Sequence, residues 1–183
     1  MKIPRPAQTE YNEFYQKYID LITQDDLLVA LAENRDALVR LFGSIPPAIE
    51  VFRYDANKWS IKEVLLHITD FERYLNFKAF VSIRNDKDTI ISHPDREQYL
   101  FNSHTETRSI ADLLPEFVSV RSSTISLFEH VNVAQLSNTG RHSNDVHAIS
   151  ARALGFAIAG HSVHHIRIIR ERYLRLSHAE SKN

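Results

Sequence analysis

The sequence contains no cysteine, and this absence excludes several classes of functional site. Without thiols the chain can form no disulfide, offer no thiolate ligand to a metal ion and supply no cysteine nucleophile. A cysteine-free composition also fits a reducing compartment, so we expect a cytoplasmic protein.

An excess of basic residues is also missing, because 22 lysine and arginine residues face 23 aspartate and glutamate residues. Binding along a nucleic-acid backbone needs a surplus of cations, so we expect no nucleic-acid partner. The first residues lack the apolar core of a signal peptide. The least polar stretch, 151–163, is too short for a membrane span and contains Arg152 and His161, so we expect no membrane segment.

Glycine is scarce as well, with 4 residues in 183, whereas leucine, alanine, glutamate and arginine are frequent. This composition favours helices over sheet. No repeat, convincing strand pair or composition shift interrupts the chain, so we expect one domain over residues 1–183. Apolar residues at spacings of three and four predict five helices, at about 9–23, 25–43, 60–84, 109–130 and 150–176.

Several local signals place the ends of these helices. Asp25 or Asp26 is suited to cap the second helix, and Gly43 to stop it. Ser60 followed by Glu63 is a capping box, in which each side chain bonds the other residue's backbone N–H. Residues 85–107 and 135–147 are polar and are expected to be loops. We therefore predict an all-α, up-down four-helix bundle with longer crossover loops and one additional helix.

Ten histidines are present, and two of them define a candidate metal site. His161 and His165 are four apart on a strongly helical segment, so both imidazoles lie on one helix face. Two such nitrogens can reach one metal ion at roughly 2 Å. The side chain of His164 points to a different side of the helix, so we expect it to lie next to the metal site without binding the ion. Gly160 allows another helix to approach closely where the ligands begin.

His67 is the natural third ligand. It lies in the middle of a core-facing helix, where burying an unpaired imidazole is costly. Asp70 follows three residues later on the same face, so it could accept a ligand N–H or bind a metal-bound water. Three neutral nitrogens and an open position would let a divalent ion activate water or a substrate.

Each of these residues also has a simpler interpretation. The histidine pair could consist of exposed surface residues without a ligand, and His67 could be a core histidine with an ordinary hydrogen-bond partner. Asp70 could be a solvated carboxylate or one paired with Arg73 or Tyr74. Trp59 could line a substrate opening, but we favour a role as a hydrophobic staple before the Ser60 cap. The remaining histidines are interpreted as surface residues, namely His93, His104, His130, His142, His147 and His178.

Four segments together resemble the DinB-like superfamily, a family of metal-dependent hydrolases that includes bacillithiol and other low-molecular-weight thiol transferases. They match in order and separation along nearly the whole chain. The first two are the aromatic stripe Tyr11–Ile22 and the run Lys58–Glu63. The others are Leu66–Asp70 and Ala159–His165, which contain the three histidines.

The resemblance implies that one histidine of an early helix and two of a late HxxxH hold a metal, commonly nickel or zinc. These positions are His67, His161 and His165 in this sequence. It implies a metal-dependent hydrolase or thiol S-transferase acting on a small molecule, with a low-molecular-weight thiol as cosubstrate of the transferase. Asp70 is the candidate catalytic base or orienting group.

A non-catalytic function is the alternative, in which a stress-related bundle binds metal or a ligand and the ion is structural. A fourth protein ligand would favour that role, and an open fourth position would favour the enzyme. The first two predicted helices carry broad apolar faces, and bundles of this class commonly pair. We therefore expect a homodimer.

Overall fold

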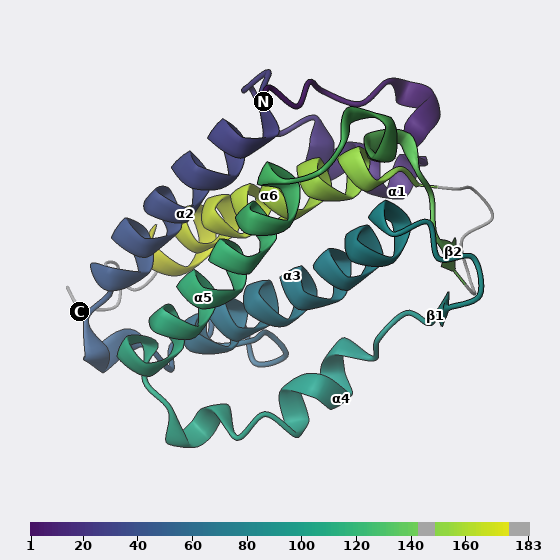
Figure 1. Ribbon diagram of the computed structural model, residues 1–183. Helices are drawn as coiled ribbons and strands as arrows, with labels where there is room; N and C mark the ends of the chain where they lie inside the picture. Colours follow the sequence, from purple (N-terminus) through teal and green to yellow (C-terminus); the bar gives the residue numbers. More distant parts are fainter. Residues whose placement is uncertain (143–148, 176–183) are drawn as a thin grey trace.

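Four long helices lie side by side in the computed structural model (Figure 1). The structure describes residues 1–142 and 149–175, apart from the side chains of residues 141 and 142. The predicted all-α four-helix bundle is confirmed. Among the described residues, no helix combines the length and apolarity needed to cross a membrane. The long helices are α2 (Leu27–Gly43), α3 (Ile61–Ile83), α5 (Ile110–Glu129) and α6 (Ala151–Ile168).

The order of the helices around the bundle follows from their contacts. Both α2 and α3 pack against α5 and α6, so α2 and α3 are diagonally opposite, as are α5 and α6. The additional helix is α1 (Glu13–Ile19), which packs against α6. The apolar stripes predicted from sequence form two buried clusters, which fill the space between these helices.

Every long helix begins after a residue whose side chain accepts a backbone N–H of the first turn. These N-caps are Asp26, Ser60, Ser109 and Ser150. The predicted capping box is present, since the N–H of Ser60 donates to Glu63 at 2.6 Å and the N–H of Glu63 donates to Ser60 at 3.4 Å. Four orphan N–H groups begin each helix, and the caps satisfy some of them.

The connection between α3 and α5 is a long crossover, as expected. It carries the chain back along the bundle, so α3 and α5 run in the same direction. The helices α2 and α3 are antiparallel, as are α5 and α6 (Figure 1). The expectation that this connection is entirely a loop is wrong in part. The segment contains β1 (Ile90–Ile91), which pairs in parallel with β2 (Arg141–His142), and the short helix α4 (Arg96–Phe101). Asp95 caps α4 by accepting the N–H groups of two residues in its first turn.

Two predicted helices differ from the observed ones at their ends. The first is shorter than predicted because Asn12 caps it and a turn of 3₁₀ helix precedes it. In the last, α6 is followed by a π-helical segment, Ile169–Leu174, which the sequence pattern did not predict. The predicted end at Leu176 and the histidines His147 and His178 lie outside the described residues.

A buried ion pair connects all four long helices. Arg121 of α5 is 0% exposed and donates to both carboxylate oxygens of Glu72 of α3, at 2.7 and 2.8 Å. The same guanidinium donates to Asn34 of α2 and Ser162 of α6. A buried charge of this kind is tolerated only when its donors are satisfied, so the network fixes the four helices relative to one another.

Candidate metal centre

The contact between α3 and α6 brings together the three histidines that the sequence singled out. Nε2 of His161 lies 3.2 Å from Nε2 of His67 and 3.1 Å from Nε2 of His165. His161 and His165 share one face of α6, one turn apart, and His67 faces them from the middle of α3. These three residues could hold a metal ion.

The two distances from Nε2 of His161 fit a metal ion. In tetrahedral coordination with metal–nitrogen bonds of about 2.0–2.1 Å, two ligand nitrogens are roughly 3.3 Å apart. A neutral imidazole nitrogen carries either a hydrogen or a lone pair, so Nε2 of His161 can form one ordinary hydrogen bond and has two close neighbours. A cation accepting all three lone pairs satisfies all three nitrogens.

Burial keeps the three imidazoles neutral. Desolvation lowers the pKa of His67 to about 4, and the charges of Arg96 and His164 add to this effect. Desolvation also holds the pKa of His161 and of His165 well below the usual value, with smaller contributions from neighbouring imidazoles. Neutral imidazole is the form that binds a metal, so no proton has to be removed at neutral pH.

The surroundings of the site are mainly aromatic. The ring of Phe71 lies 4.3 Å from that of His161, and the ring of Tyr18 lies 5.3 Å from it on another side. The ring of Trp59 is 4.6 Å from that of His67. Nδ1 of His165 is buried and has no hydrogen-bond partner among the described residues, so packing against its neighbours orients this imidazole.

Gly160 has the role expected from its position beside the ligands. A Cβ at this residue would lie 2.0 Å from the backbone oxygen of Tyr18, so α1 crosses α6 at this glycine. The close crossing places the Tyr18 ring against His161 and against His164. His164 is not one of the three residues that could hold a metal ion, and it lies beside them, as its helical position predicts.

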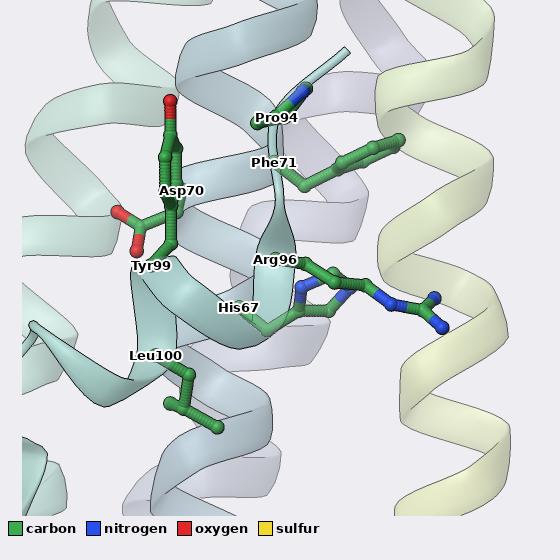
Figure 2. A pocket seen from close by; sticks show the side chains of 7 residues that line it. All are labelled: His67, Asp70, Phe71, Pro94, Arg96, Tyr99 and Leu100. Atoms are coloured by element: carbon green, nitrogen blue, oxygen red, sulfur yellow. The ribbon is translucent and has the colours of Figure 1, made fainter.

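Asp70 lies in the same small pocket as His67, between α3 and α4. Figure 2 shows its carboxylate directed away from the imidazole of His67. The carboxylate accepts a hydrogen bond of 2.8 Å from Arg73, one of the two partners considered in the sequence. Burial raises the pKa of Asp70, and the Arg73 guanidinium opposes this. The catalytic role of Asp70 stays a prediction.

A cleft of about 410 Å³ opens over the histidines, and all three line it. Its walls come from α1, α3, α4 and α6. A second pocket of about 20 Å³ adjoins His67 under α4 (Figure 2). That volume is enough for about one water molecule. The cleft is therefore large enough for a small organic molecule, and the second pocket for one water.

The sequence analysis did not predict or did not favour the places of several residues in the cleft. Trp59 lines the opening, which is the interpretation we did not favour. His93 is exposed, as expected, but it also lines the cleft. Arg96 was assigned to a loop, yet its α4 position places it beside His67. A signal for α4 existed in Asp95 followed three residues later by Gln98, which is a capping pattern.

Comparison with known proteins identifies the class to which this fold and site belong. Residues 30–169 match the DinB superfamily, and the chain belongs to this family. YfiT from Bacillus subtilis has a similar structure, with a TM-score of 0.73 and 17% sequence identity over 94% of this chain and 93% of YfiT. YfiT is described as a probable metal-dependent hydrolase with an unusual four-helix bundle topology. No curated protein matches the chain.

Proposed function

We propose that the protein is a metal-dependent hydrolase acting on a small molecule. One observation carries the proposal: three neutral imidazoles converge on one point and also line a cleft of about 410 Å³. Among the described residues, no fourth histidine or carboxylate belongs to the group. Catalytic sites commonly have three protein ligands and one open position, whereas structural sites are closed by four.

Zinc and nickel are the proposed ions. Imidazole nitrogen suits both, and the site contains neither the thiolates that select softer ions nor the oxygen ligands that hard ions need. When bound, such an ion acts as a Lewis acid and lowers the pKa of a coordinated water. Hydrolytic chemistry also agrees with the description of YfiT, which has a similar fold.

The chain's own residues would then orient the reactants. Asp70 is the candidate base because burial raises the pKa of its carboxyl group and because it borders the water-sized pocket next to His67. A base with a raised pKa accepts a proton more readily near neutral pH. Trp59, Phe71 and Tyr18 offer aromatic surface against which the organic part of a substrate could pack.

Hydrolysis assays with zinc- and nickel-loaded protein test the proposal. A panel of small esters, amides and phosphoesters should contain a substrate whose turnover disappears with a chelator and in His161→Ala. Each substrate is also offered with a low-molecular-weight thiol. Turnover that requires the thiol would show that the protein is a thiol S-transferase and not a hydrolase. Stoichiometric metal with no turnover and no access of azide to the ion would indicate a structural metal instead.

A further inference from the structure

Two cationic side chains, Lys17 and Arg96, line the cleft. Each is stacked on an aromatic ring that contacts one of the proposed metal-binding histidines. Nζ of Lys17 lies 4.9 Å from the ring centre of Tyr18, whose ring is 5.3 Å from that of His161. Cζ of Arg96 lies 5.8 Å from the ring centre of Trp59, whose ring is 4.6 Å from that of His67. Cation–π contacts of this kind hold a cation in place without neutralising it.

The two carboxylates that line the cleft have other roles. Asp95 caps α4. Glu97 accepts a hydrogen bond of 3.2 Å from the indole of Trp59, and its other oxygen lies 3.7 Å from Nε of Arg96. Among the described residues Lys17 has no carboxylate partner, and the side chain of Arg96 is 66% exposed. Both cations therefore remain accessible to a ligand.

The same two charges lie near the metal-binding imidazoles. Arg96 borders the small pocket of His67, and Lys17 and Arg96 line the same cleft as the three imidazoles. The cations thus face the ligands from two different helices, α4 and α1. Neutral imidazoles cancel none of the charge of a divalent ion, so a loaded site would be strongly positive.

We propose that the substrate carries an oxyanion, a carboxylate or a phosphate, which Arg96 and Lys17 bind beside the metal. This inference rests on the proposed function and specifies its substrate class. A guanidinium offers two parallel donors that match the oxygens of an oxyanion, and an ammonium adds a second point charge. Trp59 and Tyr18 provide flat surfaces for an attached apolar group.

Binding to cobalt-loaded protein tests the inference without requiring turnover. The visible spectrum of cobalt(II) reports first whether the site is filled and then whether a ligand reaches it. Benzoate and phenyl phosphate are the two oxyanion probes, and their relative affinities show which oxyanion is preferred. Benzamide has the shape of benzoate without its charge.

Arg96→Gln and Lys17→Gln should each weaken binding of the preferred oxyanion by about tenfold, the usual effect of losing one charge-assisted contact. Arg96→Lys should recover part of the loss because it keeps the charge, and benzamide should bind all variants alike. Arg84→Gln is the matched control, because Arg84 also stacks on an aromatic ring, at 5.4 Å from Phe80. Arg84 directly follows the last residue of α3, on the order of 25 Å along the helix axis from His67.

Equal oxyanion affinity in wild type, Arg96→Gln and Lys17→Gln would overturn the inference and leave the metal site intact. Failure of both oxyanions to bind the cobalt-loaded wild type would overturn it as well. A wild-type protein that takes up no cobalt would overturn the proposed function, and this inference with it.

Discussion

At the scale of single residues, the position of His161 between two other imidazoles is the central feature. Its Nε2 is the nitrogen closest to both partners, at 3.2 Å from His67 and 3.1 Å from His165. The His161–His165 pair could be predicted from sequence because it depends only on the helical repeat. His67 could not be joined to the pair by spacing, since their meeting depends on how α3 packs against α6. The family resemblance supplied that step.

Asp70→Asn tests the role of the carboxylate. We expect turnover or metal affinity to fall by about 10–100-fold, the usual effect of removing a group that supports a metal ligand or its water. The fold should be unchanged by circular dichroism. Glu116→Gln is the control, because Glu116 also binds Arg73, at 2.7 Å, but does not line the pocket of His67. Equal losses in both variants would assign the effect to the Arg73 ion pair.

At the scale of helices, the crossing of α1 over α6 shapes the site. Gly160 permits this crossing, and the sequence predicted such a role from its place beside the ligands. The helix α4 was not predicted, because six residues are too few to show a helical repeat. The place of Arg96 in the cleft could not be predicted for the same reason, since it depends on where α4 lies.

Gly160→Ala should therefore disturb the site by displacing α1. The new methyl group meets backbone atoms of Tyr18, which cannot rotate away, so α1 must move. We expect a loss of about 3 kcal/mol or more in the free energy of unfolding, as for severe overpacking, and weaker metal binding. Gly43→Ala is the control, since its nearest atom would be 3.9 Å away. It should raise stability by up to about 1 kcal/mol. Wild-type stability in Gly160→Ala would contradict the crossing.

At the scale of the whole molecule, a buried network holds the four long helices in register. The composition predicted a helical bundle, but not that Arg121, a charged residue, would be 0% exposed at its centre. Sequence patterns place charges on the surface, and only the observed set of partners shows why this one is inside. The expected homodimer stays a prediction.

Glu72→Gln tests this network by leaving the Arg121 guanidinium without its counter-ion. Breaking a buried pair on one side costs about 3–5 kcal/mol. Urea unfolding should show a loss of that size. Glu116→Gln, which removes two partly exposed pairs, with Arg73 and with Arg108, should cost about 2 kcal/mol or less. Similar losses in the two variants would show that burial of the Arg121 pair has no special effect.

The stability of the metal-free protein should depend on pH through the buried imidazoles. The pKa of His67 is about 4 in the folded chain against an ordinary value of 6.5, so the unfolded chain binds more protons between these values. The free energy of unfolding is therefore highest above about pH 6.5, where the imidazole is neutral in both states. It falls as the pH drops towards 4, and His67 accounts for a loss on the order of 3 kcal/mol. Thermal unfolding across this range should show a smaller fall in His67→Gln, and an unchanged one in His104→Gln, whose imidazole is exposed. A flat profile in the wild type would contradict the burial of neutral imidazoles.

Metal stoichiometry in matched histidine variants is the most direct test of the central claim. Purified protein is loaded with zinc or nickel, dialysed, and assayed for bound metal by mass spectrometry. We predict one ion per chain in the wild type and in His164→Ala, and loss of that ion in His67→Ala, His161→Ala and His165→Ala. An ion retained with unchanged affinity in His67→Ala would contradict the account, because it would show that α3 contributes no ligand.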